Sequence, residues 1–337
     1  LPGRAGQKGR AAMIRVHGVE GARLVALPGA GAAAPGALWI DLMAPTEAEE
    51  AEVEAALAID LPTRKEMREI EQTSRLYSEG EAQFMTAMIP AQAESDAPIM
   101  EPVTFVLTRA RLVTIRYHEP RAFELFIQRA AKGHTACTDG EEVMLGLLEV
   151  MVDRLGDVLE KAGQDIEQIS RRVFARDKQR SRRGPRWQVL LEEIGRKGGL
   201  VSTIRDSLGT LDRLTVFLGQ RLRGEGGAAP EDRRARLHDL GSDIRSLADH
   251  AGFVGQKVNF LLDATLGLIG IEQNTVMQIF SVVSVVFLPP TLVASVYGMN
   301  FAVMPELSWP WGYPAALGLI LISALLPYLY FRRKGWL

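Results

Sequence analysis

The sequence predicts an α+β protein, in which an N-terminal α/β domain precedes a long antiparallel helix hairpin and a very long helix that continues into the first of two C-terminal transmembrane helices. Three observations predict this order. Short runs rich in β-branched and aromatic residues are confined to the first 135 residues. Apolar residues then recur at intervals of three and four as far as Leu268, as they do in long packed helices. Beyond residue 270 charge almost vanishes: of the 39 basic and 41 acidic residues, only Glu272, Glu306, Arg332, Arg333 and Lys334 remain.

Length and composition set further limits. The 337 residues suffice for about two domains, and 47% apolar and 24% charged residues exclude collagen-like, disordered and disulfide-scaffold chains. The formal net charge of -2 gives no general attraction to nucleic acid or anionic lipid. Cys137 has no second cysteine with which to form an intramolecular disulfide. Residues 1–12 are expected to be a tag or a disordered extension, and not a signal peptide, because they lack an apolar run.

Residues 13–135 are predicted to form the α/β domain. A helix is expected to start at Thr46, since Glu49 follows three residues later and the two residues form a capping box ahead of a run that ends near Ala58. The strand candidates are runs of β-branched and aromatic residues: Met13–His17, Arg23–Leu27, Leu38–Leu42, Gln83–Ile89, Val103–Thr108 and Leu112–Tyr117.

Residues 141–223 are predicted to form the helix hairpin. Two heptad seams occupy this segment, one from Leu145 to Val173 and one from Leu190 to Leu222, and Lys197 is a polar flaw in the second. The Gly184-Pro185 break between the seams favours an antiparallel pair.

A third seam, from Leu237 to Leu268, predicts a stalk helix over residues 231–275. Pro230 and the acidic residues after it suit a helix start. No proline or turn cluster follows before the apolar run, so one continuous helix is expected from about residue 232 to residue 298, with a length of about 100 Å.

Two membrane spans are predicted, the first within residues 276–300 and the second over residues 315–331. The loop between them, residues 301–314, has no lysine or arginine, whereas residues 332–337 include Arg332, Arg333 and Lys334. The positive-inside rule therefore places both termini in the cytoplasm and the loop outside. A buried core helix is the alternative for each span.

Polar and special residues of the first span recur at helical spacing and fall on one stripe: Asn274, Met277, Ser281, Ser284, Leu288, Thr291 and Ser295. Two apolar helices make no conduit alone, so a permeation path needs several copies of the chain around an axis, with this stripe facing inward. The alternative is that these small and hydroxylated residues only mediate helix packing in the membrane.

The residues after the first span carry a family resemblance. Tyr297-Gly298-Met299-Asn300 is followed by Met304-Pro305-Glu306-Leu307, and the chain closes on a basic segment. This arrangement resembles the CorA family of divalent-cation channels, especially the magnesium transporter of Gram-negative bacteria. The resemblance implies a homopentamer in the bacterial inner membrane, with a cytosolic funnel and Mg²⁺ as the usual ion. It also implies that Gly298, Met299 and Asn300 form a ring at the outer mouth, with Asn274, Met277, Leu288 and Thr291 along the pore and Phe280 at a hydrophobic constriction.

Simple chemistry agrees with this implied filter. Mg²⁺ sheds its water reluctantly, and a ring of neutral Asn300 carbonyl oxygens can accept hydrogen bonds from the bound waters without holding the ion too tightly. Met277, Phe280 and Leu288 can form apolar collars that stop conduction by dewetting. Glu306 in the outer loop either concentrates cations near the mouth or is simply a solvated acid.

The family resemblance also implies regulation by cytosolic Mg²⁺. The candidate ligands on the stalk are Asp239, Asp243 and Asp249, and the alternative is that they are solvated surface acids. The predicted hairpin tip departs from the family, because it is basic where family members often have acids. A solvated charge run is expected there, and contact with anionic lipid headgroups or with RNA is the alternative. The residues are Arg171, Arg172, Arg176, Lys178, Arg180, Arg182, Arg183 and Arg186.

Other functions have less support. The five histidines lack metal-ligand spacing, and the sequence has no phosphate loop, dinucleotide fingerprint or nucleophile elbow, so neither an enzyme nor an organic cofactor is expected. The expected partners are divalent ions, lipid and further copies of the chain, without nucleic acid. Co²⁺ and Ni²⁺ can share a filter that measures hydrated size. The alternatives are a zinc transporter of the same superfamily and a membrane-anchored oligomeric scaffold or sensor.

Overall fold

The computed structural model describes residues 13–21, 23–29, 31–69, 75–93, 98–109, 111–133, 135, 137–174, 187–224, 230–300, 304–305 and 309–336. The chain divides into two compact units, Leu1–Leu261 and Leu262–Leu337. The expected tag or disordered extension, the Gly184-Pro185 break and most of the basic tip lie outside the described residues.

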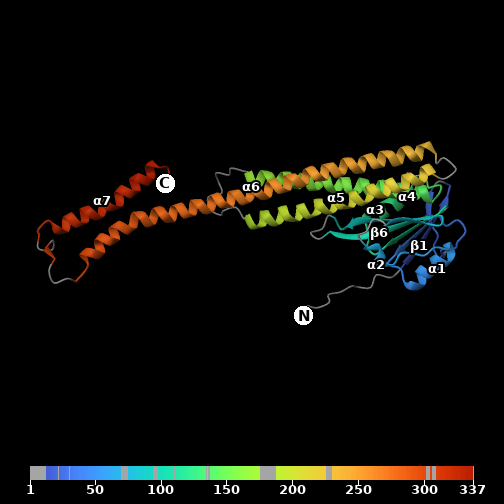
Figure 1. Ribbon diagram of the computed structural model, residues 1–337, viewed down its shortest axis with the longest axis horizontal. Helices are drawn as coiled ribbons and strands as arrows, with labels where there is room; N and C mark the ends of the chain where they lie inside the picture. The colour runs from blue at the N-terminus through green and yellow to red at the C-terminus, as the bar shows by residue number, and fades with distance from the viewer. Residues whose placement is uncertain are drawn as a thin grey trace. The chain divides into compact units, whose positions relative to one another are not determined.

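The first unit contains a mixed sheet, which has seven strands in the described part of the chain, ordered β2-β1-β3-β7-β6-β5-β4 (Figure 1). β3 and β7 pair in parallel, with Trp39 opposite Leu112, and the other described pairs are antiparallel. The strands are β1 Met13–Glu20, β2 Arg23–Ala26, β3 Trp39–Met43, β4 Leu76–Glu79, β5 Ala82–Ala91, β6 Ile99–Leu107 and β7 Leu112–Arg116.

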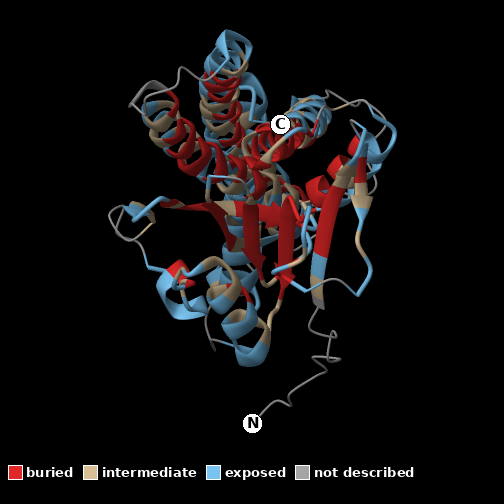
Figure 2. Cartoon of the chain, turned by 90° about the vertical axis from the view of Figure 1, so that its right-hand side faces the viewer, coloured by how far each residue is buried: buried red, intermediate tan, exposed pale blue. Residues whose placement is uncertain are grey.

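Helices cover both faces of this sheet, so its central strands are buried on both sides (Figure 2). α1 (Glu47–Leu57) and α2 (Arg64–Met67) contribute Val53 and Met67 to a core on one face. On the other face Trp39 packs against the rings of Phe123 and Phe126 from α3 (Arg121–Ala131). Because successive strand residues point to opposite faces, β3 supplies apolar side chains to both cores.

The other face also holds a buried ion pair. Arg116 donates to Asp41 at 2.9 and 2.7 Å, and the hydroxyl of Thr114 donates to the same carboxylate at 2.8 Å. Both charged side chains are almost fully buried, at 3% and 0% exposure. Because each buried charge is paired and hydrogen-bonded, the sheet accommodates them.

Three long helices follow: α4 (Gly140–Phe174), α5 (Trp187–Gly224) and α6 (Glu231–Tyr297). Their apolar seams are mostly buried, as the heptads predict, and Leu247 and Leu268 on α6 are half-buried. The predicted continuous long helix is confirmed, because α6 runs unbroken through its internal Pro289 and Pro290. The predicted capping box is also confirmed: the backbone N–H of Thr46 donates to the Glu49 carboxylate at 2.8 Å, and Glu49 N–H donates back to the threonine hydroxyl at 3.3 Å.

The sequence did not predict β4, α2 or α3. β4 and α2 have four residues each, too few for a periodic pattern to be recognised. α3 places its aromatic residues three apart after Pro120, which is a detectable signal for an amphipathic helix.

Ion pairs tie the first turns of α6 to the start of α4. We call this cluster the arginine clamp: Arg221, Arg233 and Arg236 with Asp139, Glu141, Glu142 and Glu149. Glu142 accepts from both Arg233 Nε and Arg236 Nη1 at 2.6 Å, and its side chain is only 9% exposed. Burial raises the pKa of Glu149, against the opposing attraction of Arg236. The arginine clamp therefore holds the first turns of α6, the helix whose C-terminal part is apolar.

The second unit consists of the C-terminal part of α6 together with the whole of α7 (Gly312–Arg333). Pro327 lies inside α7.

Candidate functional site

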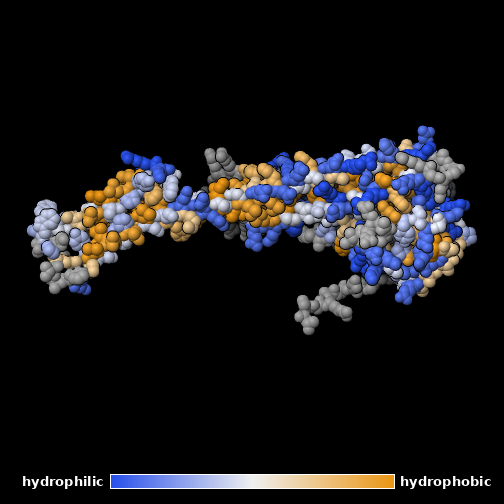
Figure 3. Space-filling model, in the orientation of Figure 1, coloured by the Kyte–Doolittle hydropathy of each residue, from blue (hydrophilic) through white to orange (hydrophobic). Residues whose placement is uncertain are grey.

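The candidate site lies on the apolar C-terminal part of α6. In the described part of the chain, α6 and α7 are long and apolar enough to cross a membrane. The apolar surface of these segments is visible in Figure 3, and large side chains such as Leu288 and Leu321, each 69% exposed, lie outside any core. Apolar surface of this extent is unfavourable in contact with water, so lipid or other protein must cover these helices.

All the predicted stripe residues lie on α6 and are exposed in the single chain. Met277, Phe280 and Leu288 have exposed fractions of 63%, 66% and 69%. The buried-core alternative for the spans therefore has no support in the described chain. A single chain cannot separate a pore-facing stripe from a packing stripe, because both are exposed until other helices cover them.

Three hydroxyls of the stripe bond to their own helix. Ser281 donates to the carbonyl of Met277 at 2.8 Å, and Ser284 donates to that of Phe280 at 2.9 Å. Thr291 donates to two carbonyls of the preceding turn at 3.0 and 2.8 Å. Each hydroxyl hydrogen is thereby used inside the helix, so the oxygen offers only lone pairs to its surroundings.

The Gly298-Met299-Asn300 motif begins where α6 ends. Gly298 N–H still bonds to the carbonyl of Ala294 at 2.9 Å, and Met299 N–H bonds to that of Val296 at 3.3 Å. A Cβ on Gly298 would lie 3.2 Å from the Ala294 oxygen, tighter than usual, so glycine suits this closing turn. Met299 and Asn300 are exposed at the helix end.

The remaining predicted residues are scattered. Asp239, Asp243 and Asp249 are exposed on α6, and no group of three or more metal-ligating side chains occurs among the residues that the structure describes. Arg332 and Arg333 occupy the last turn of α7, with Lys334 as its C-cap. Glu306 lies outside the described residues.

Comparison with known proteins shows to which family the chain belongs. The model of the family described as CorA-like Mg2+ transporter protein matches residues 35–333. The chain belongs to the CorA family. Its relatives include the magnesium transport protein CorA of Pasteurella multocida (strain Pm70), 36% identical over 326 residues, which are 96% of this chain and all of the relative. The protein of the same name from Escherichia coli (strain K12) is 37% identical over 301 residues, 89% of this chain and 92% of the relative. The family model and these relatives agree in placing the chain in the family of CorA-like Mg²⁺ transporter proteins.

Solved structures confirm the fold. The complete CorA magnesium transporter from Methanocaldococcus jannaschii matches with a TM-score of 0.75 at 18% identity, covering 98% of this chain and 99% of that one. The full-length CmaX protein matches with a TM-score of 0.68 at 15% identity, covering 99% and 100%. The cytoplasmic domain of ZntB from Vibrio parahaemolyticus matches with a TM-score of 0.56 at 10% identity, covering 77% and 99%. The α+β architecture with its long helix and second apolar helix is thus that of CorA.

The arginine clamp was missed by sequence reasoning. Its paired carboxylates and arginines lie up to 94 positions apart in the chain, so no local spacing reveals them. The run Asp139, Glu141, Glu142 at the start of α4 was a signal of the helix N-terminus, but it did not identify the cationic partners.

Proposed function

We propose that the chain is one subunit of a homopentameric channel that admits hydrated Mg²⁺ passively across the bacterial inner membrane, with both termini in the cytoplasm. The observation that carries the proposal is the placement of one exposed stripe on α6, directly before the Gly298-Met299-Asn300 turn. Five such stripes around an axis would make one continuous lining. The potential across the membrane, negative inside, favours entry of a dication by about 4.6 kcal/mol per 100 mV.

The bonding of the stripe hydroxyls supports a cation path. Water molecules bound to a cation direct their hydrogens outward and need acceptors. Ser281, Ser284 and Thr291 have already donated their hydrogens to backbone carbonyls, so they can meet those waters only as acceptors. A hydrated anion needs donors, which these side chains do not offer. Sign selectivity would then arise without any acidic side chain.

The filter and the closed gate use different residues. At the mouth, the uncharged Asn300 carbonyls would accept hydrogen bonds from the hydration shell. Deeper in the proposed pore, the side chains of Met277, Phe280 and Leu288 have no polar atoms that could replace the hydration shell. Each would form an apolar ring that excludes water when the pore narrows.

Regulation would require more than one subunit. The exposed Asp239 and Asp243 share a helix face, and Asp249 lies further along. In one chain these acids form no complete ligand set, so a regulatory Mg²⁺ would lie between neighbouring subunits and favour the closed state as internal Mg²⁺ rises. Solvated surface acids are the alternative.

The experiment is Mg²⁺ flux into proteoliposomes that contain the purified full chain. Thr291→Val removes the acceptor at nearly unchanged shape, whereas Thr291→Ser retains it. We expect about a tenfold loss of flux for valine, near 1.4 kcal/mol on the barrier, and little loss for serine. Equal flux for both variants would refute the acceptor argument.

Two further measurements decide the remaining alternatives. Asn300→Ala should reduce selectivity for Mg²⁺ over monovalent ions, and unchanged selectivity would contradict the filter assignment. Flux of Zn²⁺ in preference to Mg²⁺, Co²⁺ and Ni²⁺ would favour the zinc alternative. A scaffold or sensor would pass no ion at all.

A further inference from the structure

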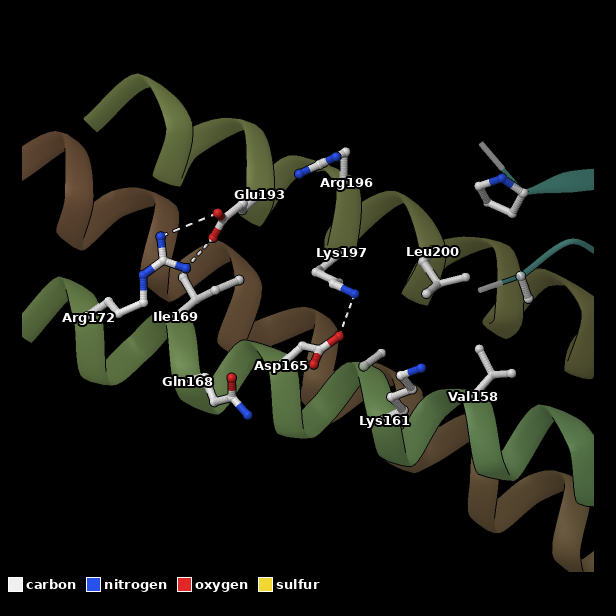
Figure 4. Close-up of a pocket in the computed structure, with 13 residues that line it drawn as sticks. Val158, Lys161, Asp165, Gln168, Ile169, Arg172, Glu193, Arg196, Lys197 and Leu200 are labelled. Atoms are coloured by element: carbon white, nitrogen blue, oxygen red, sulfur yellow. Dashed lines mark hydrogen bonds and ion pairs between the residues drawn. The ribbon is translucent and has the colours of Figure 1, made fainter. Parts of the chain in front are cut away.

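A cavity of about 300 Å³ lies between α4 and α5 in the first unit, and none of its lining residues belongs to the proposed ion path. We propose that this cavity binds a phosphate-bearing ligand, either a soluble phosphomonoester or the headgroup of an anionic lipid. This inference does not depend on ion transport. Figure 4 shows the side chains of the two helices that line it, and Ala93 and Pro98 line it as well.

Each helix presents a polar stripe to the cavity. On α4 the residues are Lys161, Asp165, Gln168 and Arg172, at intervals of three and four. On α5 they are Glu193, Arg196 and Lys197. Residues at these intervals share one helix face, so the two stripes oppose each other across the groove.

Two ion pairs cross the groove (Figure 4). Arg172 donates to Glu193 at 2.6 and 3.3 Å, and Lys197 donates to Asp165 at 2.5 Å. Asp165 and Arg172 are seven residues apart, so these pairs lie about 10 Å from each other along α4. They place Arg172 near one end of the cavity and Lys197 near its middle, since the lining continues beyond the second pair to Val158 and Leu200.

The lining has more positive than negative charge. Among the lining residues that the structure describes, four cations face two carboxylates, an excess of two charges, and both carboxylates are already paired. Lys161 has no ion-pair partner among the residues described here. A concave surface with excess charge of one sign concentrates ligands of the opposite sign, and a dianionic phosphomonoester would neutralise this excess.

The floor of the cavity is apolar and buried. Val158, Ala162, Ile169 and Leu200 have exposed fractions between 1% and 9%. Lys197 interrupts the α5 heptad seam beside this floor, where an apolar residue would pack better against α4. An apolar base below a cationic rim suits an organic phosphate, whose body covers the floor while arginine and lysine hold the phosphate oxygens.

The experiment titrates the full-length protein, purified in detergent, with AMP and separately with dihexanoyl phosphatidate, using calorimetry at constant ionic strength. The test variant is the double substitution Lys161→Gln and Arg196→Gln. Both side chains are exposed at the rim, so their loss should leave the fold intact. We expect saturable binding of at least one probe, weakened about tenfold or more in this variant.

A matched control removes the same charges elsewhere. Lys132→Gln with Arg205→Gln changes exposed residues of α3's C-cap and of α5 outside the cavity, and should leave affinity unchanged. Binding of AMP alone identifies a soluble ligand, binding of phosphatidate alone identifies a lipid headgroup, and binding of both identifies recognition of the phosphate itself. The proposal is overturned if neither probe binds at about 10 mM, or if the two double variants weaken binding equally.

Discussion

Glu142 of the arginine clamp provides a sharp test of what holds α6 in place. Its carboxylate accepts from Arg233 and from Arg236 at 2.6 Å in a site where its side chain is 9% exposed. Glu142→Gln keeps the shape of the side chain but removes its charge, and the amide group must turn its own hydrogens toward one of the two guanidinium groups.

The expected cost follows from the surviving partners. Removing one side of a buried pair costs about 3–5 kcal/mol when the other charge is left uncompensated. Here Arg233 keeps Asp139 and Glu141, and Arg236 keeps Glu149. The cost should therefore be smaller, about 2 kcal/mol, close to the loss of one charged hydrogen bond.

Hydrogen exchange of backbone amides measures this cost locally in the full-length protein. A loss of about 2 kcal/mol should speed exchange of the Leu237–Ile244 amides about 30-fold, if the start of α6 opens from the clamp. The matched control is Glu81→Gln, which breaks a 2.6 Å pair with Arg109 whose side chains are 64% and 76% exposed. That pair should contribute less than about 0.5 kcal/mol. If the two variants exchange alike, the clamp does not anchor α6.

Three further predictions concern other parts of the chain. Burial lowers the pKa of His17 and of His118, so below about pH 6.5 the unfolded chain binds protons that the folded chain refuses, and the thermal midpoint should fall between pH 7 and pH 5; a flat profile would contradict this. Burial raises the pKa of Cys137 to about 11, so Ellman's reagent at pH 8 should react slowly with native protein and fast after denaturation. Gly298→Ala should reduce Mg²⁺ flux because its Cβ would lie 3.2 Å from a carbonyl oxygen, whereas Gly318→Ala, with open space around it, should not; equal flux would refute the steric argument.

The long helices were predictable because their burial pattern repeats. The heptads that run through Leu240, Ile244 and Val254 predicted a face that is indeed buried, and Thr46 with Glu49 predicted a helix start from two residues alone. Such signals are local, and helical period or cap chemistry is sufficient to detect them. The short β4 depends instead on pairing with β5, and no four-residue pattern specifies that.

The sequence predicts which residues of the candidate site share one helix face, but it does not predict their hydrogen-bond partners. Spacing put Ser281, Ser284 and Thr291 on one stripe, yet it could not tell where their hydroxyl hydrogens go, because a serine in a helix can bond to its own backbone or to a neighbour. The same limit applies to Lys197, whose break in the heptad was visible while its partner Asp165, 32 positions away, was not. Contacts between distant segments depend on packing that one helix does not encode.

An uncharged lining is well suited to Mg²⁺ in the proposed channel. From Gln273 to the end of α6 there is no charged side chain, although the proposed cargo carries two positive charges. A carboxylate at this depth would attract the ion strongly, and it would also be costly to bury whenever the ion left. Mg²⁺ releases its bound waters reluctantly. The path therefore has only to offer hydrogen-bond acceptors to the outward-pointing hydrogens of the hydration shell. In such a channel, hydroxyls that are bonded to their own backbone, such as those of Ser281 and Thr291, would supply acceptors without charge, and the membrane potential would supply the direction of transport. Weak acceptors together with an external driving force let the ion enter and also leave, which a site of high affinity would prevent.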